Sequence, residues 1–371
     1  MSKVAYSVID GVHRKNKKGY AVVDGVNRKI KKAYSIIGGV ARPCWSGGEL
    51  AYYGAITSLS AKRYEFAATS NDNYAIFLGG TGDVTAVDAY NKSLSKTTPS
   101  TLPTGKLQHA ATTVGNYALF GFGQTGASLS RTVYAYDSAL TRKDAETGLD
   151  DRYELAATTV GNHALFGGGM GYSLKNTVDA YDTSLTQSNP SGFGTARQML
   201  AATTVGSYAL FGGGSDSSGY GSTVVDAYNS SLTRSTPTAL RTETRQLAAT
   251  TVGNYALFGG GQDGKKHFHK TVNSYNPSLT RSTAADLTNG KYCLSATTVG
   301  DYAIFGGGYA SGNYYDKVDA YDASLTKTTF TVTRMKKYSM AATSIGNYAI
   351  FGGGFNTSFK SDNTVDAFTV A

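Results

Sequence analysis

From about residue 60 onward, one pattern of apolar and polar positions recurs seven times. A run of small and β-branched residues, as in "LAATTV", precedes a Gly-Asn type pair, the apolar segment "YALF" or "YAIF", and two or three glycines. A variable segment, the alternating segment "TVDAY" and the tripeptide "SLT" complete the unit. The units begin 43 to 47 residues apart, at Ala67, Ala110, Ala156, Ala201, Ala248, Ser295 and Ala341. Short apolar runs bounded by glycine pairs predict β-strands.

Each unit predicts four antiparallel strands. In the third to fifth units the first strand ends at Gly161-Asn162, Gly206-Ser207 and Gly253-Asn254, pairs whose residues accept the positive φ of a tight hairpin. "YALF" is the second strand, a segment such as 178–181 is the third, and "SLT", as at 184–186, is predicted as the outermost fourth strand. Four strands in about 45 residues, repeated radially, is typical of a β-propeller blade. We therefore expect an all-β protein with a seven-bladed propeller over residues 49–371.

Counting strands also predicts how the ring closes. The seventh unit ends with its third strand at 365–368, and only three residues follow. The segment 49–54 precedes the first unit at the spacing of a fourth strand. We expect it to complete the last blade, because an incomplete blade would leave an exposed edge strand and an open ring.

Residues 1–48 repeat with a different period, of 14 residues. The repeats read "AYSVIDGVHRKNKK", "GYAVVDGVNRKIKK" and "AYSIIGGVARPCW", with turns predicted at Asp10-Gly11, Asp24-Gly25 and Gly38-Gly39. Such hairpins are too small to bury a core alone, so this arm is expected to dock on a partner, on copies of itself or on the propeller.

Two resemblances to known families follow from these motifs. The glycine doublet after "YALF", the Tyr-Asp of "VDAYD" and the basic residue before the first strand resemble the kelch repeat over about residues 49–371. The outer-strand tryptophan of kelch repeats is replaced by Thr in "SLT". The "GVxRKxKK" units resemble N-terminal segments of structural proteins of bacteriophages and prophages from Gram-positive hosts. Some kelch-type propellers are copper oxidases with Tyr, Cys and His ligands, but Cys44 and Cys293 have no matching partners here.

Charge is concentrated in the arm. The chain has a net charge of +9, and residues 1–45 alone contribute +8. A partner recognised by charge is therefore expected there. Nucleic acid is disfavoured, because Tyr and Val alternate within the hairpins. The anchoring candidates in the arm are Arg14, Lys15, Arg28, Lys29, Arg42 and Trp45.

Composition restricts the class of protein. Hydrophobic residues make up 40% and charged residues 16% of the chain, which excludes a disordered protein. The sequence contains no apolar run of membrane-spanning length and no apolar core of a signal peptide, so we expect neither a membrane span nor classical export. Two isolated cysteines fit folding in a reducing cytoplasm. The expected location is a virion or phage-like particle, assembled from protein made in the bacterial cytoplasm.

A basic residue precedes the first strand of every unit. In a closed ring these seven residues could surround one mouth of the channel and bind an anion. Alternatively, they pair with the third-strand acids Asp88, Asp179, Asp226, Asp319 and Asp366 as a brace between blades, which is the interpretation we favour. The seven residues are Arg63, Lys106, Arg152, Arg197, Arg245, Lys291 and Lys337.

Metal and phosphate chemistry finds little support. His267 and His269 could hold a metal, but the sequence places no third ligand beside them, and a polar loop tip is the favoured interpretation. The glycine runs, such as 167–169, lead from a strand into a loop, whereas a phosphate loop leads into a helix. We expect no cofactor and no metal.

The loops between second and third strands all leave the same face and differ freely among the units. They are rich in Tyr, Ser, Gly and Asn, residues typical of binding surfaces. The candidate contacts are Tyr172, Tyr220, His267, Phe268, Tyr309, Tyr314, Tyr315, Phe355 and Phe359.

These observations predict a non-enzymatic component of a phage or phage-like particle. The arm is expected to anchor the chain to other particle proteins, with possible self-association, and the loop face to bind a host-surface glycan or protein. The alternative is a purely structural decoration protein without a ligand. A sugar-modifying enzyme has the least support, because no set of acid, base and nucleophile stands out against the repeats.

Overall fold

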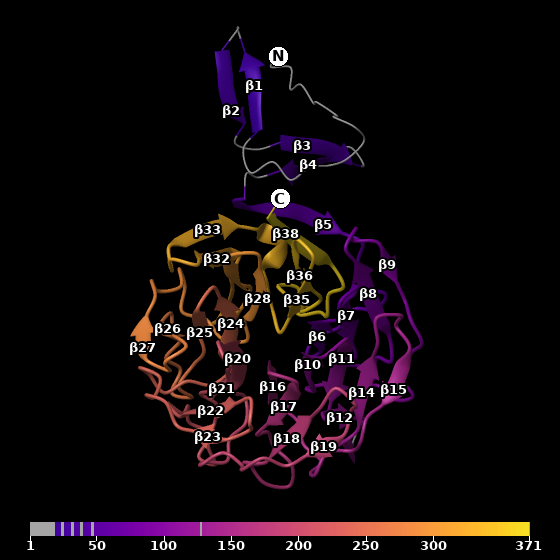
Figure 1. The fold of residues 1–371 in the computed structure, drawn as a ribbon, viewed down its shortest axis with the longest axis vertical. Coiled ribbons are helices and arrows are strands. Elements are labelled where there is room, and N and C mark those ends of the chain that lie inside the picture. Colours follow the sequence, from indigo (N-terminus) through magenta and orange to yellow (C-terminus); the bar gives the residue numbers. More distant parts are fainter. Residues whose placement is uncertain are drawn as a thin grey trace.

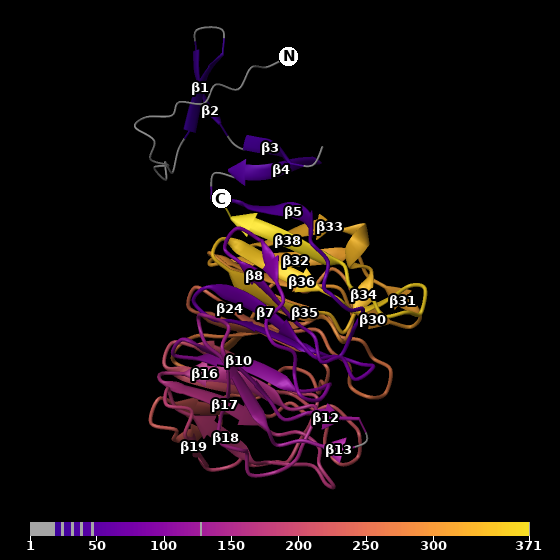
Figure 2. The same cartoon turned by 90° about the vertical axis from the view of Figure 1, so that its right-hand side faces the viewer.

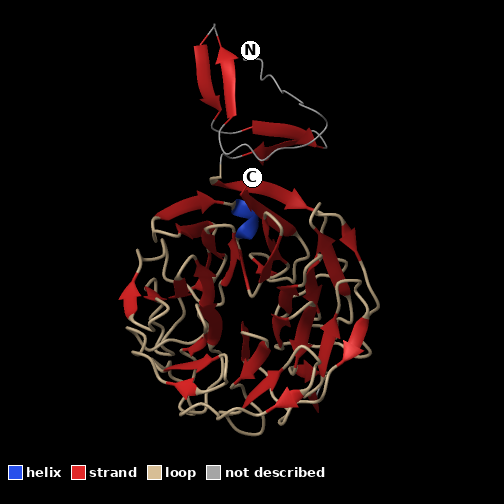
Figure 3. Ribbon diagram, viewed as in Figure 1, coloured by secondary structure: helices blue, strands red, loops and turns tan. Residues whose placement is uncertain are grey.

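In a computed structural model of the protein, seven four-stranded antiparallel sheets form a closed ring around a central channel (Figure 1). The structure describes residues 19–23, 26–30, 33–37, 40–45, 48–126 and 128–370, with side chains from residue 48 onward. The expected all-β, seven-bladed propeller is confirmed (Figure 3).

Blades 1 to 7 follow the order of the units, and the four strands of each blade are ordered from the channel to the rim. The innermost strands are β6 (Ala67–Ser70), β10 (Ala110–Val114), β16 (Ala156–Val160), β20 (Ala201–Val205), β24 (Ala248–Val252), β28 (Ser295–Val299) and β35 (Ala341–Ile345). The second strands are β7 (Tyr74–Leu78), β11 (Tyr117–Gly121), β17 (His163–Gly167), β21 (Tyr208–Gly212), β25 (Tyr255–Gly259), β29 (Tyr302–Gly306) and β36 (Tyr348–Gly352).

The third strands are β8 (Val87–Asn91), β14 (Val133–Tyr136), β18 (Val178–Tyr181), β22 (Val225–Asn229), β26 (Val272–Tyr275), β32 (Lys317–Asp322) and β38 (Val365–Val370). The outermost strands are β9 (Lys96–Thr97), β15 (Arg142–Asp144), β19 (Gln187–Ser188), β23 (Arg234–Ser235), β27 (Arg281–Thr283), β33 (Lys327–Thr331) and β5 (Leu50–Ile56). The loops hold β12 (Gln124–Thr125), β13 (Ser128–Leu129), β30 (Tyr309–Ala310), β31 (Asn313–Tyr314), β34 (Lys337–Tyr338), β37 (Phe355–Asn356) and a 3-10 turn, η1 (Thr333–Met335).

The hydrophobic core lies between neighbouring blades. In blade 3, Phe166 packs edge-on against Tyr181, with ring centroids 5.8 Å apart, and both side chains are fully buried. Gly167 follows Phe166 because the next blade needs the space: a Cβ there would lie 2.4 Å from Phe193 and 3.1 Å from Phe211. The glycine after "YALF" is therefore structural, as interpreted from the sequence, and the structure adds that it makes room for the next blade.

A belt of threonine hydroxyls joins the innermost strands. The Thr158 and Thr204 hydroxyl oxygens lie 2.9 Å apart, and the Thr204 hydroxyl also donates to the Thr159 carbonyl at 2.6 Å. The same pair of contacts recurs at most blade junctions, for example from Thr251 to Thr203 and to the Thr204 carbonyl. The "AATT" motif thus supplies hydrogen bonds from blade to blade.

The predicted fourth strand at "SLT" was wrong. In blade 3 this segment is a turn: the Asp182 carboxylate accepts hydrogen bonds from the backbone N–H of Ser184 at 2.8 Å and of Thr186 at 3.0 Å. Leu185 takes a φ of +68° within it. An Asp or Asn side chain that bonds the backbone two residues on favours such turns, so the fourth strand, β19, begins one residue after the tripeptide.

The predicted closure of the ring is confirmed. Strand β5 pairs antiparallel with β38 and completes blade 7, with Leu50 opposite Val370 and Ile56 opposite Val365. The Tyr52 hydroxyl donates to the Asp366 carboxylate at 2.7 Å. The two ends of the propeller sequence are therefore joined within one sheet, as Figure 1 shows near the label C.

Two hairpins precede β5. Strand β1 (Gly19–Val23) pairs with β2 (Val26–Ile30), and β3 (Ala33–Ile37) pairs with β4 (Val40–Trp45). Both lie outside the ring, on the side of β5 (Figures 1 and 2). The hairpin predicted around Asp10, with Arg14 and Lys15, lies outside the described residues. Of the other anchoring candidates, Arg28 and Lys29 lie on β2, and Arg42 and Trp45 lie on β4.

Among the residues that the structure describes, no helix is long and apolar enough to cross a membrane.

Candidate functional site

The basic residues before the innermost strands do not form an anion site at the channel mouth. Six of the seven are buried within the blades, with side chains at most 2% exposed. Three of them pair with the third-strand acid of their own blade: Arg63 with Asp88 at 2.5 Å, Arg152 with Asp179 at 2.5 Å, and Arg197 with Asp226 at 2.7 Å. The brace interpretation therefore holds for these three, but inside one blade and not between blades.

The buried lysines of this set bond mainly to neutral oxygens. Lys106 donates to the Phe122 carbonyl at 2.8 Å and the Thr132 carbonyl at 2.8 Å, and burial lowers its pKa to about 7. Lys291 donates to the Lys317 carbonyl at 2.9 Å, and burial lowers its pKa to about 8. Lys337 bonds the Thr364 hydroxyl at 2.6 Å and lies 3.3 Å from the Asp362 carboxylate. None of these ammonium groups is presented to a ligand.

Arg245 was assigned to this set wrongly. It stands three residues before Ala248, whereas the other members stand four residues before the start of their innermost strands. The buried position in blade 5 belongs to Thr244, whose hydroxyl donates to the Gly260 carbonyl at 3.1 Å. Asn273 replaces the usual third-strand acid there. Blade 5 thus lacks both the buried cation and the buried anion.

The channel mouth on the loop face is built from seven residues of one repeat position, each with a positive φ between 50° and 56°. Their backbones form a chain of hydrogen bonds from blade to blade, each N–H donating to the preceding carbonyl at 2.8 to 3.0 Å across six junctions. An αL conformation at a residue other than glycine is costly and persists where its surroundings impose it. The seven residues are Glu65, Gln108, Glu154, Met199, Gln246, Cys293 and Ser339.

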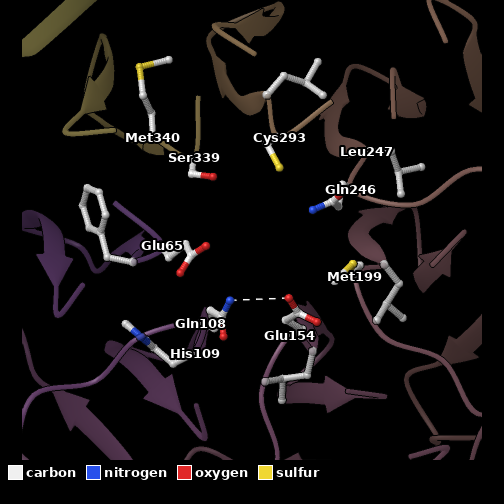
Figure 4. A pocket seen from close by; sticks show the side chains of 14 residues that line it. Glu65, Gln108, His109, Glu154, Met199, Gln246, Leu247, Cys293, Ser339 and Met340 are labelled. Atoms are coloured by element: carbon white, nitrogen blue, oxygen red, sulfur yellow. Dashed lines mark hydrogen bonds between the residues drawn. The ribbon is translucent and has the colours of Figure 1, made fainter. Parts of the chain in front are cut away.

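These seven residues line a cavity of about 250 Å³ together with the residues that follow them in sequence. Polar side chains gather on the side of blades 1 to 3, where Gln108 lies beside Glu154, with Nε2 and Oε1 3.5 Å apart (Figure 4). Burial and the nearby carboxylate of Glu65 raise the pKa of Glu154 to about 7, against the effect of Arg245. Burial raises the pKa of Glu65 as well, and that of the Cys293 thiol to about 12.

The rim around this mouth pairs two segments in every blade. The residue before each mouth residue bonds the first residues of a loop that leaves a second strand. Tyr292 pairs with Tyr309, and Tyr338 on β34 pairs with Phe355 on β37. In blade 1, the Thr81 N–H donates to the Tyr64 carbonyl at 3.0 Å. Figure 2 shows β30, β31 and β34 on the same face as β12 and β13.

Aromatic side chains on this rim form a continuous row from the loop of blade 5 to the start of blade 1. Neighbouring ring centroids lie 5.0 to 5.7 Å apart along it. Tyr314 and Phe359 flank the row. The Tyr314 ring centroid lies 5.8 Å from that of Tyr338 and 6.4 Å from that of Phe359. We call this set the aromatic row: Phe268, Tyr292, Tyr309, Tyr338, Phe355 and Tyr64.

The structure therefore brings five of the predicted loop contacts together: Phe268, Tyr309, Tyr314, Phe355 and Phe359. Three members of the row, Tyr64, Tyr292 and Tyr338, were missed by the sequence analysis. They recur three residues before the Ala-Ala-Thr start, so their position in the repeat could have pointed to them. Their pairing with the loops could not be read from the repeat alone.

The remaining predicted contacts lie apart from the row. Tyr172 is fully exposed in blade 3, and Tyr220 of blade 4 lies under the Lys265 ammonium, 4.9 Å from its ring centroid. His267 Nδ1 lies 2.6 Å from the Asp263 carboxylate. Tyr315 is half-buried, and its N–H donates to the Gly308 carbonyl at 3.2 Å.

A metal site at His267 and His269 would need a third ligand side chain nearby. Burial lowers the pKa of His269. Within residues 48–126 and 128–370, no group of three His, Cys, Asp or Glu side chains is placed to hold a metal ion.

Comparison with known proteins supports the architecture alone. No protein-family profile matches the chain, and no curated protein matches its sequence. Solved structures do match, among them one titled "Structure of YjhT", with a TM-score of 0.60 and 10% sequence identity over 74% of this chain and 99% of that chain. At this identity the likeness supports the β-propeller fold and shows nothing about the ligand.

Proposed function

We propose that the protein is a non-enzymatic binding protein whose loop face binds a carbohydrate. The observation that carries this proposal is the aromatic row at the edge of a cavity lined by carboxylate and amide side chains. Loops that differ among otherwise similar blades are the part of a repeat protein where binding is usually found.

The chemistry of this face fits a sugar better than a protein surface. A sugar ring presents C–H groups on its faces and hydroxyls on its edges, so it needs an apolar platform beside hydrogen-bonding groups. The row supplies the platform, and four of its six members are tyrosines, whose hydroxyls can also hydrogen-bond. Glu65, Gln108 and Glu154 supply carboxylate and amide oxygens at the adjacent mouth.

Binding without catalysis is proposed because the mouth lacks an activated thiol or hydroxyl nucleophile. The thiol and hydroxyl candidates there are Cys293 and Ser339. A thiol with a pKa of about 12 stays protonated at neutral pH and is a poor nucleophile. No histidine or carboxylate is shown hydrogen-bonded to the Ser339 hydroxyl among the described residues, which leaves it without a base.

For the arm, we propose anchoring in a larger assembly, a phage or phage-like particle. Its support is the concentration of charge, with +8 of the net +9 in residues 1–45, and the paired hairpins that precede the propeller. The proposal also rests on two sequence resemblances, that of the propeller units to kelch repeats and that of the arm to phage structural proteins. The bound carbohydrate would then be a host-surface glycan.

An array of bacterial surface polysaccharides and oligosaccharides tests carbohydrate binding with the full chain. We expect saturable binding that Tyr338→Ala weakens at least tenfold. Tyr117→Ala is the matched control, because Tyr117 begins β11 at the end of the sheet opposite the loop face. Absence of binding to every glycan by the folded protein would refute the proposal and favour a structural decoration protein.

A further inference from the structure

The aromatic row is longer than a single sugar ring can cover. Six rings follow one another along the channel rim, from the blade 5 loop to the segment before blade 1, with no step above 5.7 Å. Extending the proposed carbohydrate function, we propose that the row binds a linear glycan along several consecutive sugar units and not through one terminal sugar.

The size of the adjacent cavity supports a ligand that lies along the row and does not enter the mouth. Sites that enclose a small ligand have volumes of roughly 300 to 1,000 Å³ and bury most of the ligand surface. The mouth cavity measures about 250 Å³, and seven blades contribute to its wall. It is therefore too small to enclose a sugar with its linked neighbours, whereas the row lies outside it and all six of its side chains are partly exposed.

The row has a centre and two ends. Tyr338 is the centre, because its ring contacts Tyr309 at 5.5 Å, Tyr314 at 5.8 Å and Phe355 at 5.4 Å. Burial raises the pKa of Tyr338 to about 12, so its hydroxyl stays protonated and can donate a hydrogen bond at any physiological pH.

Phe268 forms one end, stacked on Tyr292 with centroids 5.6 Å apart and an interplanar angle of 14°. Tyr64 forms the other end and contacts Phe355 at 5.0 Å. A short ligand can occupy the centre without reaching either end, whereas a long ligand contacts both.

This difference gives a test that separates the length of the ligand from its class. The strongest ligand on the array is partially hydrolysed, and its fractions of one to eight units are titrated into the full chain by calorimetry. We expect the affinity to rise with each added unit until the row is covered. Tyr338→Ala should weaken binding of every fraction, whereas Phe268→Ala and Tyr64→Ala should weaken only the longer ones, each by about two- to tenfold.

The controls keep the result interpretable. Tyr117→Ala, on the opposite face, should bind all fractions as tightly as the natural protein does, and far-UV circular dichroism should show that each variant retains its sheets. The inference is overturned if the one-unit fraction binds as tightly as the eight-unit fraction. It is also overturned if Phe268→Ala weakens short and long fractions equally. Either result leaves carbohydrate binding itself intact, whereas failure of the array removes both.

Discussion

The buried Arg197–Asp226 pair should be replaceable as a unit but not one residue at a time. Arg197 and Asp226 are both fully buried, and Arg234, which is 28% exposed, also contacts Asp226 at 2.7 Å. In blade 5 the corresponding buried pair is neutral, Thr244 and Asn273, and Arg281 stands at the position of Arg234. We predict that Arg197→Thr and Asp226→Asn together reproduce this neutral arrangement in blade 4.

The magnitude follows from what each change leaves behind. Asp226→Asn alone strands a buried guanidinium, which should lower the free energy of unfolding by about 3 to 5 kcal/mol. Arg197→Thr alone leaves Asp226 with Arg234, but removes the bonds that Arg197 donates to the carbonyls of Gly213 at 2.8 Å and Phe211 at 3.1 Å. Lost packing and hydrogen bonds should cost about 2 to 4 kcal/mol.

In the double variant no buried charge is left without a partner. Its cost should therefore be close to that of Arg197→Thr alone, so the coupling between the two changes should equal the cost of Asp226→Asn alone, about 3 to 5 kcal/mol. Urea unfolding of the four proteins, followed by far-UV circular dichroism, measures this coupling. Asp182→Asn is the matched control: it makes the same chemical change in an exposed turn, where three other blades already carry Asn91, Asn229 and Asn276.

The reasoning would be refuted by additivity. If Asp226→Asn lowers the free energy of unfolding equally with Arg197 and with Thr at position 197, within about 0.5 kcal/mol, the two residues do not act as a brace.

Three further predictions concern the mouth, the belt and the closure of the ring. Because the pKa of Glu154 is raised from 4.5 to about 7, the folded state binds a proton more tightly than the unfolded state, and the free energy of unfolding should fall as the pH rises between these values. Glu154→Gln should flatten this fall and be about 1 to 2 kcal/mol more stable than the natural protein above pH 7. Parallel pH curves of the two proteins would contradict this prediction. Thr204→Val removes two bonds of the belt and should cost about 1 to 2 kcal/mol in urea unfolding, whereas the exposed Thr280→Val should cost little, and equal costs would speak against the belt. Deleting residues 1–56 removes β5 and should broaden thermal unfolding, whereas deleting residues 1–47 should not; the same sharp transition in both would show that β5 does not close the ring.

Local signals explain why the strands could be predicted from the sequence. The turn at Gly206-Ser207 and the alternation of 178–181 are properties of a few adjacent residues, and both recur at a fixed period. Closure by β5 followed from counting strands, since the seventh unit lacked one. The "SLT" segment misled because Leu185 looks like a strand residue, whereas the preceding Asp182 determines a turn.

The candidate site was less predictable because its contacts cross between loops and blades. Arg245 was aligned one position away from its true place in the repeat. The buried position inside the blade belongs to Thr244, and Arg245 lies on the rim. The positive φ at Glu65 and its counterparts depends on hydrogen bonds between residues more than forty positions apart. The stacking of Phe268 on Tyr292 also joins two separate segments, since Phe268 belongs to the loop of blade 5 and Tyr292 precedes blade 6.

The division of labour within the repeat explains how one part of the face can specialise. The threonine belt, the buried braces and the glycine packing occupy repeat positions that face other blades, so a change there disturbs two sheets at once. The rim position before each mouth residue bears none of these contacts, and it carries Leu107, Gln198 and Arg245 in some blades and tyrosine in others. Tyrosines at 292, 338 and 64 fall in consecutive blades, and the loop aromatics of blades 5 to 7 meet them there, whereas Tyr153 of blade 3 holds the same position outside the row. The row is therefore continuous where three adjacent blades carry tyrosine at this position. It spans blade 7, the blade that β5 completes, so the strand that follows the arm closes the sheet at the centre of the proposed binding face.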